Sequence, residues 1–114
     1  MGSFNSDSKA KIANIVNNAR NHPMYQSYQI SAYCGDWRTG VQIVEISKNG
    51  DTINQFHFFP GISGEIESIA IYGRNLSGHL NAIRSSMSIF GLPVASAEMD
   101  SGYSDFVDVY LENY

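Results

Sequence analysis

The chain has 114 residues, of which 43% are hydrophobic and 16% charged, and its formal net charge is −4. This composition predicts one folded domain, residues 1–114, and excludes a disordered chain. The acidic balance argues against direct nucleic-acid binding, and no apolar run is long enough to span a bilayer. Because a single cysteine cannot form an internal disulfide, we expect a soluble, cytoplasmic protein that does not bind a membrane.

The N-terminal segment, residues 6–21, has the residue spacing of an amphipathic helix. Its apolar residues recur at helical intervals and form one narrow stripe: Ile12, Ile15, Val16 and Ala19. Ser6 or Asp7 is expected to cap the start of this helix, and Pro23 prevents its continuation. A narrow stripe predicts that the helix lies on one face of a sheet.

Three strands are expected after this helix, and the second and third are joined by Asn49-Gly50, the preferred sequence of a type I′ hairpin turn. In the register that this turn implies, Lys48 faces Asp51 and Ser47 faces Thr52. The same register pairs apolar residues further along, namely Ile46 with Ile53, Ile43 with Phe56 and Val41 with Phe58.

The first of these strands ends at Cys34, which alternation places on its apolar face. A free cysteine in such a position is expected to be a small buried hydrophobe rather than a nucleophile. One cysteine and three scattered histidines match no zinc-binding pattern, so no metal and no cofactor are expected.

The remaining elements are a fourth strand, a second helix and a second hairpin. Residues 65–72 fit both a strand and a helical face, and their Ile and Tyr content favours the strand. Residues 76–90 carry a continuous helical seam and are followed by Gly91, whereas residues 94–114 read as a hairpin. The sequence therefore predicts an α+β fold: an antiparallel β-meander of three or four strands, two helices packed on one face, and a C-terminal β-hairpin.

Catalysis would require folding to bring His57 and His79 together, with Glu65, Glu67 or Tyr72 nearby as partner. Nothing in the spacing of these residues selects such a site, and the chain lacks surplus basic charge to hold a phosphate backbone. We therefore expect a protein that is not an enzyme. The alternative is a small enzyme or small-ligand-binding domain, ribonuclease-like or nucleotide-binding, that uses a His57/His79 cleft.

Charge is distributed unevenly along the chain. Residues 1–84 contain all seven Lys and Arg and six Asp and Glu, whereas residues 85–114 contain five acids and no basic residue. These acids alternate with aromatic residues in the C-terminal segment. Acids with aromatic anchors between them are suited to contact a basic protein, because the charges steer the encounter and the rings supply buried contact area. The residues expected to make this contact are Asp100, Tyr103, Asp105, Asp108, Tyr110 and Glu112.

A second candidate surface is the loop 35–40, in which Trp37 precedes Arg38, a composition typical of interface hot spots. The alternative is that Trp37 folds back over the edge of the sheet. For the acidic segment, the alternative is that its charges only keep an edge strand soluble, and pairing of that edge with a second copy is a further option.

Together these features predict a small acidic inhibitor that occludes a basic surface of a larger partner, such as a nucleic-acid-binding enzyme or complex. Bacterial immunity proteins, antitoxins and phage anti-defence proteins such as anti-CRISPRs are proteins of this type. The chain resembles them in size and charge, not through a shared motif.

Overall fold

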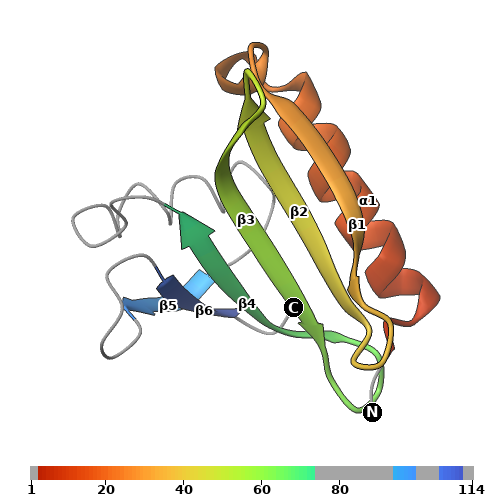
Figure 1. Ribbon diagram of the computed structural model, residues 1–114. Helices are drawn as coiled ribbons and strands as arrows, with labels where there is room; N and C mark the ends of the chain where they lie inside the picture. The colour runs from red at the N-terminus through yellow and green to blue at the C-terminus, as the bar shows by residue number, and fades with distance from the viewer. Residues whose placement is uncertain (1–2, 74–93, 100–105, 112–114) are drawn as a thin grey trace.

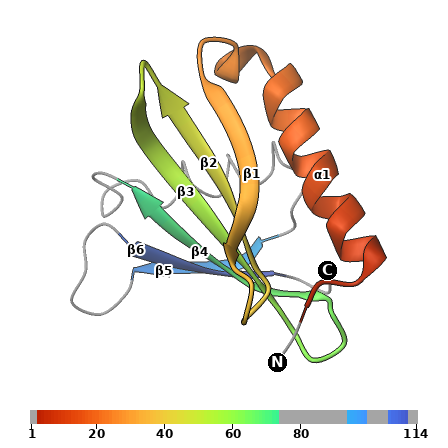
Figure 2. The ribbon, with the colours of Figure 1, turned by 45° about the vertical axis from the view of Figure 1, so that its right-hand side comes forward.

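The computed structural model describes residues 3–73, 94–99 and 106–111. The six strands form one antiparallel sheet in the order β1-β2-β3-β4-β6-β5, and α1 lies over one face of it (Figures 1 and 2). The elements in chain order are α1 (Ser6–Asn21), the 3₁₀ turn η1 (Pro23–Tyr25), β1 (Gln29–Asp36), β2 (Val41–Lys48), β3 (Asp51–Pro60), β4 (Ile66–Gly73), β5 (Val94–Met99) and β6 (Phe106–Leu111).

The predicted α+β class and the antiparallel sheet of four consecutive strands, β1 to β4, are confirmed. The segment that fitted either a strand or a helix is strand β4. The second helix predicted at residues 76–90 and the turn predicted between β5 and β6 lie outside the described residues. Within the part of the chain that is described, no helix has the length and apolar character needed to cross a bilayer.

Helix α1 has the predicted bounds, and the predicted stripe of Ile and Val residues is buried against the sheet. Its N-cap, however, is Asn5 and not Ser6 or Asp7. Asn5 has an extended backbone, and its Oδ1 accepts a hydrogen bond from the Ser8 amide at 2.8 Å. Ser6 and Asp7 fall inside the first turn, where a side chain cannot serve as N-cap.

The register of β2 and β3 differs from the predicted one beyond the turn. Lys48 faces Asp51 and Ser47 faces Thr52 as predicted, but the next pair is Ile46 with Asn54. A β-bulge at Ile53 inserts one residue into β3, so every later partner shifts by one.

The predicted pairs Ile46–Ile53, Ile43–Phe56 and Val41–Phe58 are therefore wrong. The bulge instead places Phe56 opposite Val44 and opposite Ile71. All three side chains are buried, so the bulge aligns them in the layer between the sheet and α1. That layer forms the core, whose largest fully buried residues are Phe58, Ile15, Ile46, Ile69, Ile71 and Val44.

Cys34 is exposed, which corrects the prediction that it is buried. It lies near the end of β1, the first strand of the sheet, and only Ile30 in this strand is buried. An outermost strand has a neighbouring strand on one side only, so alternation gives the face of its residues but does not ensure that they are covered.

Candidate functional site

The turn between β1 and β2 presents Trp37 to solvent. Its side chain is 82% exposed, so it does not fold back over the sheet edge. The Asp36 carboxylate accepts a hydrogen bond from the Arg38 amide at 2.9 Å, which fixes the turn. The Arg38 guanidinium lies 5.7 Å from the centre of the Trp37 ring, within cation–π range. The turn therefore displays a large aromatic surface with an adjacent positive charge.

A second arrangement lies on the sheet face opposite α1, which we call the outer face. Glu45 accepts hydrogen bonds from Tyr33 Oη at 3.2 Å and from Gln55 Nε2 at 2.7 Å. The Gln55 side-chain oxygen lies 3.0 Å from His57 Nε2. Since an amide oxygen only accepts, His57 donates from Nε2. We call these four side chains, Tyr33, Glu45, Gln55 and His57, the polar cluster.

An aromatic residue extends the polar cluster onto β4. The centres of the His57 and Tyr72 rings lie 4.4 Å apart. Tyr72 is 39% exposed and Tyr33 is 41% exposed, so the arrangement has a partly accessible tyrosine at each end. Its members come from four neighbouring strands, β1 to β4, and their side-chain positions are fixed by the strand pairing and by the hydrogen bonds between them.

Two groups of the polar cluster have shifted pKa values. Burial lowers the pKa of His57, which favours the neutral imidazole. Burial and the neighbouring Glu45 carboxylate raise the pKa of Tyr33, so the phenol stays protonated and donates to Glu45. This arrangement therefore combines the Glu45 carboxylate with an imidazole that favours its neutral form and a Tyr33 phenol that stays protonated.

Strand pairing connects this face with the acidic C-terminal strands. Ala70, which faces His57, also faces Asp108 on β6, and Asp108 faces Glu98 on β5. One cross-strand row therefore runs through all six strands, in the order Tyr33, Ile43, His57, Ala70, Asp108 and Glu98. In the adjacent row, Tyr72 faces Phe106.

The predicted site residues are brought together only in part. Trp37 and Arg38 form the exposed turn, and His57 lies beside Tyr72. Asp108 and Tyr110 are in β6. Outside the described residues lie Asp100, Tyr103, Asp105, Glu112 and His79, so their predicted roles stay predictions.

Sequence reasoning missed Tyr33, Glu45 and Gln55 as members of a site. The signal was present, because each is a polar or aromatic residue on the non-core side of a strand. Their mutual proximity depends on the bulge at Ile53, which aligns Gln55 with Glu45. No pattern in a single strand indicates that pairing.

The lowered pKa of His57 predicts a pH-dependent stability. As pH falls below about 6.5, the unfolded chain takes up a proton that the folded state resists, so the free energy of unfolding should decrease. We expect this decrease between about pH 7.5 and about pH 5 to be larger in the native protein than in a His57→Gln variant. Urea titrations across this range measure it; parallel profiles for the two proteins would contradict the prediction.

In the part of the chain that the structure describes, no three His, Cys, Asp or Glu side chains gather as metal ligands. Comparisons of the chain with protein-family models, with curated proteins and with solved structures give no match.

Proposed function

We propose that this protein is a non-catalytic binding domain that covers a basic surface of a larger protein and so inhibits it. The observation that carries the proposal is the cross-strand row on the sheet. It connects the half-exposed Tyr33 with Asp108 and Glu98 of the last two strands. Acids and tyrosines along one sheet supply the steering charges and the aromatic contact area that such an interface needs.

The predicted second helix and C-terminal hairpin belong to this proposal. Its acidic contact includes Asp100, Tyr103 and Asp105, which lie in the sequence between β5 and β6, and Glu112, which follows β6. Two strands of the sheet, β6 and β5, then carry the acidic contact. The exposed Trp37 beside Arg38 supplies a second contact at the turn between β1 and β2. The partner is a basic protein, such as an enzyme or complex that binds nucleic acid.

The proposal is tested by capture of the partner from a lysate of the natural host, at low and at raised salt. An acid-driven complex should weaken as salt screens its exposed charges. The double variant Asp105→Lys, Asp108→Lys should lose the partner, and Trp37→Ala should weaken its capture. The control is Asp7→Lys, which makes the same type of charge change on exposed helix α1. Unchanged capture by the Asp105/Asp108 variant would overturn the proposal.

A second candidate function is a small enzyme or ligand-binding domain, favoured by the contact between the tilted rings of His57 and Tyr72. In that case the variant His57→Ala, His79→Ala would lose an activity or a bound ligand, whereas the acid-to-lysine variant would keep it. Under the preferred proposal the histidine variant captures the partner as well as the native protein does. The two variants therefore separate the two functions.

A further inference from the structure

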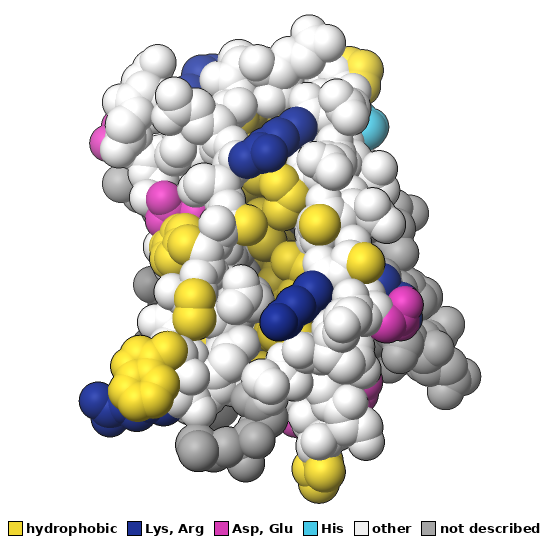
Figure 3. Space-filling model, turned by 90° about the vertical axis from the view of Figure 1, so that its right-hand side faces the viewer, with side chains coloured by type: hydrophobic (Ala, Val, Ile, Leu, Met, Phe, Trp, Pro, Cys, Tyr) yellow, Lys and Arg dark blue, Asp and Glu magenta, His cyan; other side chains and the backbone are white. Residues whose placement is uncertain are grey.

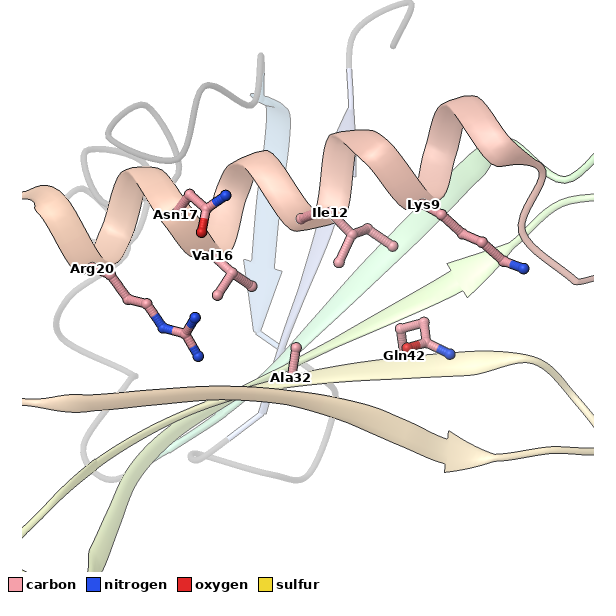
Figure 4. A pocket seen from close by; sticks show the side chains of 8 residues that line it. Lys9, Ile12, Val16, Asn17, Arg20, Ala32 and Gln42 are labelled. Atoms are coloured by element: carbon pink, nitrogen blue, oxygen red, sulfur yellow. The ribbon is translucent and has the colours of Figure 1, made fainter.

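A groove lies between helix α1 and the first two strands, on the sheet face away from the polar cluster. It has a volume of about 430 Å³. Ile12 and Val16 of α1 form its apolar floor, and Ala32 of β1 lies opposite them (Figure 4). Figure 3 shows this hollow as an apolar strip that is open to solvent. All of its lining residues are described, and the proposed acidic contact uses none of them.

The groove has a cation at each end. Lys9 and Arg20 line it from the first and last turns of α1 (Figure 4), and both are exposed. The residues lining the groove include no Asp or Glu. Lys11 pairs with Asp7, one helical turn before it, at 3.3 Å. No carboxylate of the described residues lies within ion-pair distance of Lys9 or Arg20. An occupant with negative charge at both ends would complement this groove.

The separation of the two cations favours an extended chain over a compact anion. Lys9 and Arg20 are eleven residue steps apart on the helix, which corresponds to about 16 Å along its axis. A single carboxylate would reach only one of them. An extended peptide rises about 3.3 Å per residue, so acids four to six residues apart would reach both. Alternate apolar side chains between the acids would lie on Ile12 and Val16.

Beyond Ile30, strand β1 provides backbone groups for such a peptide. It is the terminal strand of the sheet. From Gln29 to Gly35 it carries no proline and no charged residue, the residue types that usually prevent an edge strand from pairing with another chain. Arg20 bonds the Ile30 carbonyl through Nε and Nη2, at 3.0 and 2.6 Å. A guanidinium has five N–H donors, so three remain for a carboxylate.

We propose that the groove between α1 and β1 binds an extended peptide segment of a partner protein, with alternate apolar residues and an acid at each end, by strand addition to β1. This mode combines main-chain hydrogen bonds from the sheet edge with pockets for alternate side chains. It is independent of the proposed acidic contact, because the two surfaces share no residue and prefer partners of opposite charge.

The test uses a fluorescent seven-residue peptide, Glu-Thr-Val-Thr-Val-Thr-Glu, acetylated and amidated at its ends. A matched peptide has Gln in place of both Glu. Anisotropy titrations of the full chain should show saturable binding of the Glu peptide, and binding of the Gln peptide should be weaker by about tenfold or more. Equal affinity for both peptides, or no saturable binding of either, overturns the proposal.

Three variants locate the binding. Lys9→Glu reverses one terminal charge and Ala13→Trp fills the groove; both positions are exposed, so the fold should persist. Each variant should bind the Glu peptide with an affinity lower by about tenfold or more. Lys48→Glu makes the same charge change at an exposed site outside the groove and should leave the affinity within about twofold. Native-like affinity in Lys9→Glu or Ala13→Trp, with circular dichroism showing both folded, overturns the proposal.

Cys34 gives a separate structural readout. It is the only cysteine of the chain, is exposed on β1 and pairs with Gln42, a residue that lines the groove. A peptide strand added to β1 should slow its reaction with Ellman's reagent by several-fold. An unchanged rate at saturating peptide would overturn strand addition. A dimer in sedimentation experiments that protects Cys34 without peptide would mean that a second copy is the occupant.

Discussion

Replacing Phe58 with alanine is expected to lower the free energy of unfolding by about 3–5 kcal/mol. Phe58 is completely buried and is among the largest fully buried side chains of the molecule. It lies on β3, between Gln42 of β2 and Ile69 of β4, so strands on both sides restrict collapse around a cavity. Loss of the ring removes apolar contacts and leaves space that a paired sheet cannot close.

Urea titration followed by circular dichroism measures this loss as a lower transition midpoint with an unchanged slope. Phe58→Leu keeps most of the volume and should lose less than half as much. Ile62→Ala is the surface control: Ile62 is fully exposed, so its loss should stay within about 0.5 kcal/mol. A decrease below about 1 kcal/mol for Phe58→Ala would show that the core tolerates the cavity and would contradict the assigned packing.

Phe58 also connects the core with the outer face. It follows His57 on β3, and alternation directs the two side chains to opposite faces of the sheet. The residues that fill the core therefore fix the position of the polar cluster on the other side. In a Phe58→Ala protein that still folds, a shifted strand no longer aligns the His57 imidazole with Gln55. The part of the pH dependence of the free energy of unfolding that His57 contributes should therefore become smaller.

Local patterns in the sequence were sufficient for the helix and for the turn. The stripe from Ile12 to Ala19 predicted α1 because helical spacing is a property of one continuous segment. Asn49 has a φ of 53° and Gly50 of 83°, the positive values that made Asn-Gly a turn signal. Both features depend only on neighbours in the chain, so a single sequence contains all the information that they need.

The candidate sites depended on contacts between distant segments, and there the sequence was insufficient. The bulge at Ile53 lets Phe56 pack against Val44 and Ile71, which lie on the strands to either side of it. The sequence of one hairpin gives the pairing of two strands and does not include the third. The exposure of Cys34 follows from the position of β1 at the end of the sheet. The groove has the same origin, because Lys9 and Arg20 gain a shared function only when α1 lies beside β1.

The second large effect is expected at Gly64, in the turn between β3 and β4. Gly64 has a φ of +80°, which an L-residue adopts only with strain. A Cβ there would lie 2.7 Å from the Asn5 amide nitrogen and 2.9 Å from the Ser3 carbonyl oxygen. Both are backbone atoms and cannot rotate away. Gly64→Ala should therefore lower the free energy of unfolding by about 2–4 kcal/mol, combining backbone strain with overpacking.

The close approach at Gly64 joins the start of α1 to the sheet. The Asn5 amide donates to the Gly64 carbonyl at 3.0 Å, and the Asn5 side chain donates to the Ser63 carbonyl at 3.2 Å. Asn5 is also the N-cap of α1, so a displaced Asn5 weakens the helix start and the attachment of the helix together. Gly64→Ala should consequently loosen the Lys9 end of the groove between α1 and β1.

Gly50→Ala is the matched control, because Gly50 has a similar φ of +83° but nothing within 4 Å of an added Cβ. Its substitution carries only the backbone strain, about 1–2 kcal/mol. The difference between the two variants in urea titrations therefore measures the contact between the turn and the N-terminal segment. Equal losses would mean that this contact relaxes freely, and α1 would then be held to the sheet by its buried Ile and Val stripe and by the hydrogen bonds from Arg20 to Ile30.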